Sequence, residues 1–153
     1  VDLLAEDRDT TYLRTNFFQL ACDDDFVIVY GVNHEQTGKA IYSNFSFYGV
    51  ELLNGVSGTT SAEYANSAAD YFPPGYGNSK YYYVYKIARR ARDPEPCVIV
   101  PYSTGNPSGK AFGVDNNKDA YIAFRAYIDV NTQVGPSLFE IIWDRAILFT
   151  KAR

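Results

Sequence analysis

Apolar and polar residues alternate along most of the chain, and this period of two predicts β-strands. In the segment 121–130, Ile122 and Phe124 point to one side, whereas Tyr121 and Arg125 point to the other. The same test predicts strands over Tyr12–Ala21, Phe26–Val32, Ile41–Val50, Lys80–Ala88, Cys97–Val100 and Arg145–Lys151. Many short strands separated by turn residues are typical of a sandwich of two antiparallel sheets.

Helix signals are few. Capping boxes at Thr60–Glu63 and Ser137–Glu140 predict two short helices, the first extending to about Asp70. The sequence therefore predicts a mainly β fold with one or two short helices: an antiparallel β-sandwich, jelly-roll-like or immunoglobulin-like. A length of 153 residues fits one such domain, spanning residues 1–153.

Composition excludes several classes of protein. Hydrophobic residues make up 46% and charged residues 21%, which is typical of a folded domain and not of a disordered chain. No apolar run approaches the roughly 18–20 residues of a membrane helix, so we expect no membrane span. A net charge of −4 argues against nucleic acid as a partner, because such binding depends on neutralising phosphates.

Charge is unevenly distributed. Residues 1–25 contain seven acids against Arg8 and Arg14, a balance of −5, and a basic stretch surrounds Arg89 and Arg90. Opposite charges on one surface favour head-to-tail association between copies of a chain. We expect residues 1–15 to extend from the domain and to contact a neighbouring molecule as an added strand.

The two cysteines, Cys22 and Cys97, lie far apart in sequence and have no metal-binding spacing. They form either a disulfide or two buried thiols. We expect the disulfide, and with it a secreted or cell-surface protein.

Catalytic signatures are missing from the sequence. His34 is the single histidine and lies in a predicted turn, so any hydrolase of the Ser/His/Asp or Cys/His kind would depend on it. Several carboxylates are present, but no spacing selects a glycosidase pair. We therefore expect no enzyme, and a small hydrolase is the least favoured of three functional hypotheses.

One segment partly matches a calcium loop. Asp115, Asn117 and Asp119 place oxygen side chains at alternate positions, as such a loop requires. The match ends at Ala120 and Ala126, where the motif needs Gly and a bidentate Glu. We therefore expect no obligatory cofactor, with a calcium ion on these three residues as the alternative.

Tyrosine is unusually abundant, with 14 residues in the chain, and it suits contact surfaces because a flat ring carries a hydroxyl group. Two predicted strands would share a polar, aromatic face if they belong to one sheet. The candidate ligand-binding residues are Tyr42, Asn44, Tyr48, Tyr121, Arg125 and Tyr127.

These observations favour a non-catalytic extracellular domain that works by contact. Its partner would be a protein, chiefly another copy of the chain in a filament or surface assembly, bound through tyrosine-rich sheet faces and the N-terminal segment. The alternative is a carbohydrate-binding module that uses the same tyrosines, with or without calcium.

Overall fold

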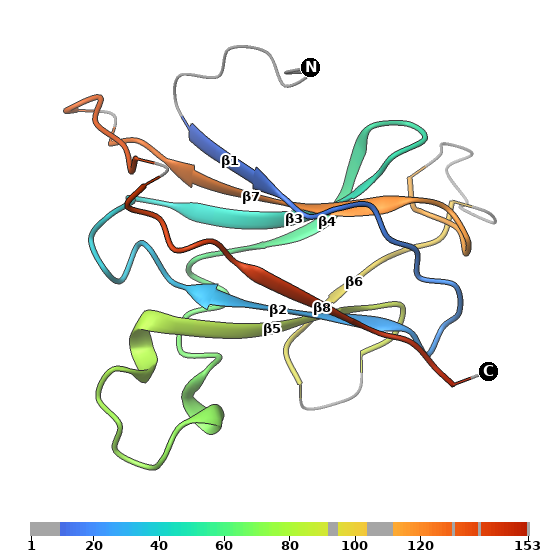
Figure 1. The fold of residues 1–153 in the computed structure, drawn as a ribbon, viewed down its shortest axis with the longest axis horizontal. Coiled ribbons are helices and arrows are strands. Elements are labelled where there is room, and N and C mark those ends of the chain that lie inside the picture. The colour runs from blue at the N-terminus through green and yellow to red at the C-terminus, as the bar shows by residue number, and fades with distance from the viewer. Residues whose placement is uncertain (1–9, 92–94, 104–111, 130, 138, 153) are drawn as a thin grey trace.

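A computed structural model describes residues 10–91, 95–103, 112–129, 131–137 and 139–152 of the chain. It is a β-sandwich in which two four-stranded sheets face each other as two layers (Figure 1). The fold class predicted from the alternation of apolar and polar residues is confirmed. None of the described residues forms a helix that is long and apolar enough to cross a bilayer.

The eight strands divide equally between the sheets. They are β1 (Thr10–Arg14), β2 (Phe26–Val32), β3 (Ser43–Gly49), β4 (Asn54–Thr60), β5 (Tyr82–Ala88), β6 (Cys97–Ile99), β7 (Ala120–Tyr127) and β8 (Arg145–Phe149). Sheet A has the strand order β1-β7-β3-β4, and sheet B has the order β6-β5-β2-β8. All neighbouring strands are antiparallel except β5 and β6, which are parallel.

The core lies between the sheets and is centred on Phe45. In β3 every second residue is buried, which is the pattern expected of a strand with one face against a core. The Phe45 ring stacks on Tyr64 and on Tyr83, with ring centroids 5.8 Å apart in both pairs. Because Phe45 belongs to sheet A and Tyr83 to sheet B, this aromatic stack joins the two sheets. Burying such a side chain stabilises the fold by about 1.5–3 kcal/mol.

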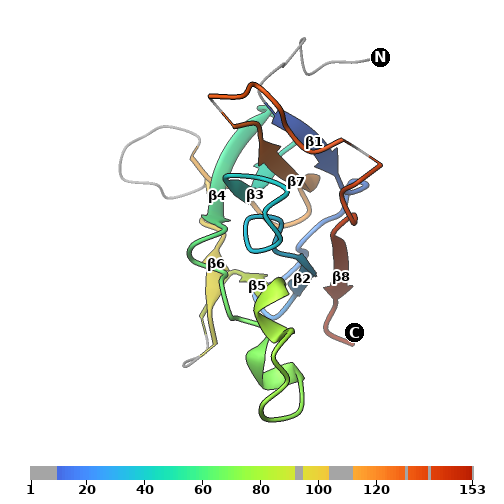
Figure 2. The ribbon, with the colours of Figure 1, turned by 90° about the vertical axis from the view of Figure 1, so that its left-hand side faces the viewer.

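The sandwich is closed along one side and open along the other. On the closed side β4 touches β6, whereas β1 and β8 are the edge strands of the two sheets on the opposite side (Figure 2). Leu148 pairs with buried Val27 and so belongs to the inner face of sheet B, yet it is 38% exposed. The inner surfaces of the edge strands therefore meet solvent.

Several local predictions differ from the structure, among them the strand predicted over Tyr12–Ala21, which ends at Arg14 as β1. Residues 54–60 were not predicted as a strand, because glycine, serine and threonine dominate them and no alternation is visible. They form β4 because β3 supplies a hydrogen-bonded template, with a bulge between Phe47 and Tyr48.

The capping box at Thr60 forms, since Glu63 Oε2 accepts the Thr60 N–H at 2.8 Å. No α-helix follows it. Asn66 takes a left-handed φ of 61°, which interrupts helical geometry, and only the 3₁₀ turn η1 (Ala69–Tyr71) is present. A second 3₁₀ turn, η2 (Ser79–Tyr81), precedes β5. The segment after Ser137 contains turns in place of the second predicted helix.

The N-terminal segment falls into two parts. Residues 10–14 form β1 and pair with β7 of the same chain. Residues 1–9 lie outside the described residues, so the predicted contact of this segment with a neighbour stays a prediction.

Candidate functional site

The structure brings the six predicted ligand-binding residues together on the outer face of sheet A. They are Tyr42, Asn44 and Tyr48 at β3 and Tyr121, Arg125 and Tyr127 on β7. The register places Asn44 opposite Arg125 and Tyr48 opposite Tyr121. The two strands thus share one sheet, which was the condition for a common face.

The aromatic rings of this face pack against one another. Tyr48 and Tyr121 stack with centroids 5.0 Å apart and planes 9° apart. Arg125 Nη2 donates to the Tyr48 hydroxyl at 2.8 Å, and its guanidinium lies 4.6 Å from the centre of the Tyr12 ring. Because Tyr48 and Tyr121 cover each other's ring faces, a ligand would meet ring edges and hydroxyl groups more than open ring planes.

The predicted calcium ligands take part in local hydrogen bonds. Asp115 Oδ1 accepts the Ser103 N–H at 2.9 Å, and Asp119 Oδ1 accepts from Gln19 Nε2 at 2.7 Å. Asn117 adopts a left-handed φ of 59° in the turn between them. In the described part of the chain, no three His, Cys, Asp or Glu side chains are arranged to hold a metal ion.

The expected disulfide is wrong, because Cys22 and Cys97 are both free thiols. Cys22 precedes β2, and its Sγ donates to Asp25 Oδ1 at 3.1 Å. Cys97 begins β6, which β5 separates from β2 in sheet B. The free thiols remove one support for an extracellular location.

His34 is buried, with 2% of its surface exposed. Its Nε2 lies 3.3 Å from the Ile142 carbonyl oxygen, and its Nδ1 has no hydrogen-bond partner. Burial lowers the pKa of the imidazole, while the contact with Ile142 opposes that shift. Burial thus favours the neutral ring, which packs edge-on against Phe124.

The outer face of sheet B is largely apolar, with Lys86 among its side chains, which the sequence did not reveal. Cross-strand pairing aligns Ala88, Phe26 and Phe149 in one row and Lys86, Ile28 and Ile147 in the next. We call this surface the apolar face; its apolar members are Phe26, Ile28, Tyr30, Val84, Ile99, Ile147 and Phe149. Large exposed apolar patches on proteins often mark interaction sites.

Between β1 and β8 the open side forms a narrow cleft of about 120 Å³, which we call the edge cleft. Its apolar walls are Leu13, Val29, Phe45, Ile122, Phe124 and Ala146. An apolar cavity of roughly 150 Å³ takes up a benzene molecule. The edge cleft therefore matches a single branched or aromatic side chain in size.

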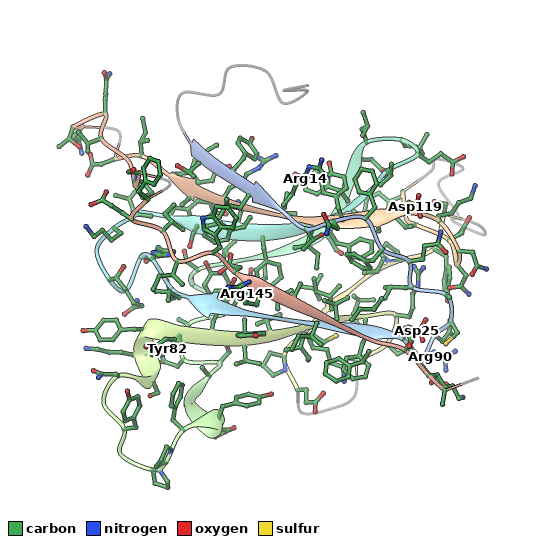
Figure 3. All side chains as sticks on the ribbon, viewed as in Figure 1. Arg14, Asp25, Tyr82, Arg90, Asp119 and Arg145 are labelled. Atoms are coloured by element: carbon green, nitrogen blue, oxygen red, sulfur yellow. The ribbon has the colours of Figure 1, made fainter. Side chains whose placement is uncertain are left out.

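Two arginines flank the edge cleft, Arg14 at the end of β1 and Arg145 at the start of β8 (Figure 3). Arg14 lies 5.1 Å from the centre of the Phe17 ring and makes no ion pair within the described residues. Arg145 is exposed and likewise has no ion-pair partner in the described ranges. The opening is thus positively charged around an apolar interior.

A buried carboxyl group lies beside the edge cleft. Asp144 directly precedes β8, and its carboxylate oxygens are shielded from solvent and have no hydrogen-bond partner in the described part of the chain. Burial raises the pKa of Asp144 to about 7, and an interaction with the Tyr83 hydroxyl partly opposes the shift. Gly31 makes room for this group, because a Cβ at that position would overlap the carboxylate.

Sequence reasoning missed both features at the start of β8. A strand was predicted over Arg145–Lys151, and β8 covers its first five residues, all of which are exposed at a sheet edge. The unalternating run Ala146-Ile147-Leu148-Phe149 could have signalled apolar side chains on both faces of that strand. A glycine in the middle of the apolar β2 sequence could have signalled a close approach from another segment.

Comparisons with models of protein families, with curated proteins and with solved structures found no match to this chain.

Proposed function

We propose that this chain is a non-catalytic structural or interaction domain that self-associates through the β8 side of the sandwich. The β8 side consists of the apolar face, the edge strand β8 and the edge cleft. The observation that carries the proposal is the continuity of these three features. A half-buried, largely apolar sheet face, with Lys86 among its side chains, adjoins a strand whose five residues are all exposed.

An edge strand of this composition is expected to pair with another strand or to be shielded from solvent. Proteins usually protect sheet edges with charged residues, prolines or bulges, because unpaired N–H and C=O groups invite another strand. Within the described residues β8 pairs only with β2, and Arg145 is its single charged residue. Ile147 and Phe149 are 45% and 42% exposed on the outer side of the same strand. Covering them on association would stabilise a complex by removing apolar surface from water.

A second copy of the chain fits this surface by charge. The β8 side presents Arg14 and Arg145, whereas residues 1–9 of the sequence carry four acids against one arginine, a balance of −3. The acidic segment and the arginine-bearing opening are different parts of the chain. Their attraction therefore favours a head-to-tail contact between two molecules.

Ile147→Lys is expected to weaken self-association at least tenfold, because it places a charge at the centre of the contact. Ile147 points outward, so folding should be preserved. Sedimentation velocity over a range of protein concentrations measures the effect, with Leu52→Lys as the control at an equally exposed site on the β3–β4 turn. Ile147→Thr retains the strand preference and should weaken association in the same direction. Association that is unchanged in both Ile147 variants would contradict the proposal.

The tyrosines of sheet A support a second candidate function, a carbohydrate-binding module. The supporting observation is the cluster of Tyr48, Tyr121 and Arg125, which joins aromatic rings to a hydrogen-bond donor on the outer face of sheet A, although Tyr121 itself is buried. A glycan array probed with the wild-type chain, with and without a calcium chelator, tests it. Silence across diverse glycans removes this function.

A further inference from the structure

The β8 side specifies the chemistry of the segment that would cover it. A strand added to β8 must place one apolar side chain in the edge cleft, beside the small side chain of Ala146. On the other side of the added strand, an apolar residue must meet Ile147 and an acid must meet Arg145. The occupant is thus an extended segment with apolar residues on both faces and a carboxylate beside them.

Residues 1–9 of this chain carry that pattern. The sequence contains adjacent leucines, Leu3 and Leu4, which in a strand point to opposite faces. Asp2 and Glu6 share the face of Leu4. The nine residues include four acids and one arginine, a balance of −3 that complements Arg14 and Arg145.

We infer that residues 1–9 of a second copy add to β8 as a parallel strand, with Leu3 of that copy in the edge cleft. This inference rests on the proposed function and names the segment that binds. In this register Asp2 lies beside Arg145, Leu3 beside Ala146 and Leu4 beside Ile147. If Leu4 stays beside Ile147, an antiparallel strand would instead place Leu3 beside Leu148 and Ala5 beside Ala146, so that only an alanine would face the edge cleft.

The segment reaches a second copy more easily than it reaches its own β8 side. The edge cleft is lined by Leu13, Arg14 and Thr15, at the far end of β1 from residue 9. The segment would have to reverse direction just before Thr10 to cover the cleft of its own chain. The sequence Glu6-Asp7-Arg8-Asp9 contains two aspartates, which turns accept, but no glycine or proline, the residues that most strongly favour a tight reversal. Exchange between two molecules needs no such turn.

A charge exchange tests the register. Asp2→Arg alone and Arg145→Asp alone should each weaken self-association about tenfold, because each leaves two like charges side by side at the contact. The double variant Asp2→Arg, Arg145→Asp should restore association to within about threefold of the wild type. Sedimentation equilibrium gives the three dissociation constants, and thermal unfolding of each variant checks that the domain remains folded.

The outcomes separate this inference from the proposed function. Single variants that associate like the wild type, or a double variant that associates no better than the singles, overturn the inference. Self-association that persists in both single variants but is lost in Ile147→Lys would preserve the proposed function with another segment as the cover. A wild-type chain that stays monomeric at every concentration overturns both. If the effects of the Asp2 and Arg145 substitutions on the thermal unfolding of a monomer are not additive, the segment covers its own chain. This result also overturns the inference.

Discussion

Asp144→Asn is expected to raise the free energy of unfolding at pH 8 by about 2–4 kcal/mol and to leave it nearly unchanged at pH 3. The reason is that the carboxyl group of Asp144 is buried against Gly31, where burial disfavours its ionised form. Asparagine has nearly the same shape, cannot ionise, and offers an amide group to the Tyr83 hydroxyl.

The pH window follows from the direction of the pKa shift. Burial raises the pKa of Asp144 from its ordinary value of 3.8 to about 7 in the folded chain. The folded state therefore binds a proton that the unfolded state releases near pH 4. Stability from this group is complete below pH 4 and is lost as the pH rises to 7.

Urea unfolding of the wild type and of Asp144→Asn between pH 3 and pH 8 measures this difference. Asp70→Asn is the matched control, since Asp70 is exposed and its substitution should change the free energy of unfolding by less than about 0.5 kcal/mol. A difference between wild type and Asp144→Asn that does not grow from pH 4 to pH 7 would show that Asp144 is not a buried, destabilising group.

Gly31→Ala should lower the free energy of unfolding by about 1–3 kcal/mol in the wild type, because the new methyl group overlaps the Asp144 carboxylate. In an Asp144→Ala background the same change should be neutral or stabilising. Only the Tyr83 ring then lies close, 3.3 Å from the added carbon, and alanine suits a strand better than glycine.

A double-mutant cycle on Gly31 and Asp144 isolates this interaction, with an expected coupling of about 1–3 kcal/mol. Gly77→Ala is the control, because a Cβ at that position meets no atom within 4 Å. Additive effects of the two substitutions would mean that Asp144 does not lie over Gly31.

The period of two was sufficient to predict the strands that carry the core. It gave the bounds of β2 without error, and it located β3, β5, β7 and β8 to within a few residues. Among them, β3 contrasts a buried side with a half-buried one, and this contrast is visible in the sequence, whereas β2 and β8 are runs of apolar residues. In β4, small and polar residues carry no such contrast, so its strand character depends on β3 as a neighbour.

The shared sheet face of the candidate ligand-binding residues could be predicted from the sequence, and the β8 side could not, for a physical reason. Tyr48, Tyr121 and Arg125 needed only correct alternation and one shared sheet. The edge cleft depends on which strands end up at the sheet edges, and strand order is a property of the whole fold. The position of Asp144 against Gly31 joins residues more than 100 positions apart, and local patterning contains no information on such a contact.

Hydrogen exchange of the β8 amides at several protein concentrations tests the central claim most directly. If a second copy covers the β8 side, the backbone amides of Arg145–Phe149 that point away from β2 should exchange more slowly as the protein concentration rises. The reason is that these amides then donate hydrogen bonds to the added strand. The amides of β3, in the centre of sheet A, should show no such dependence. Exchange in β8 that is rapid and equal at all concentrations would contradict the account.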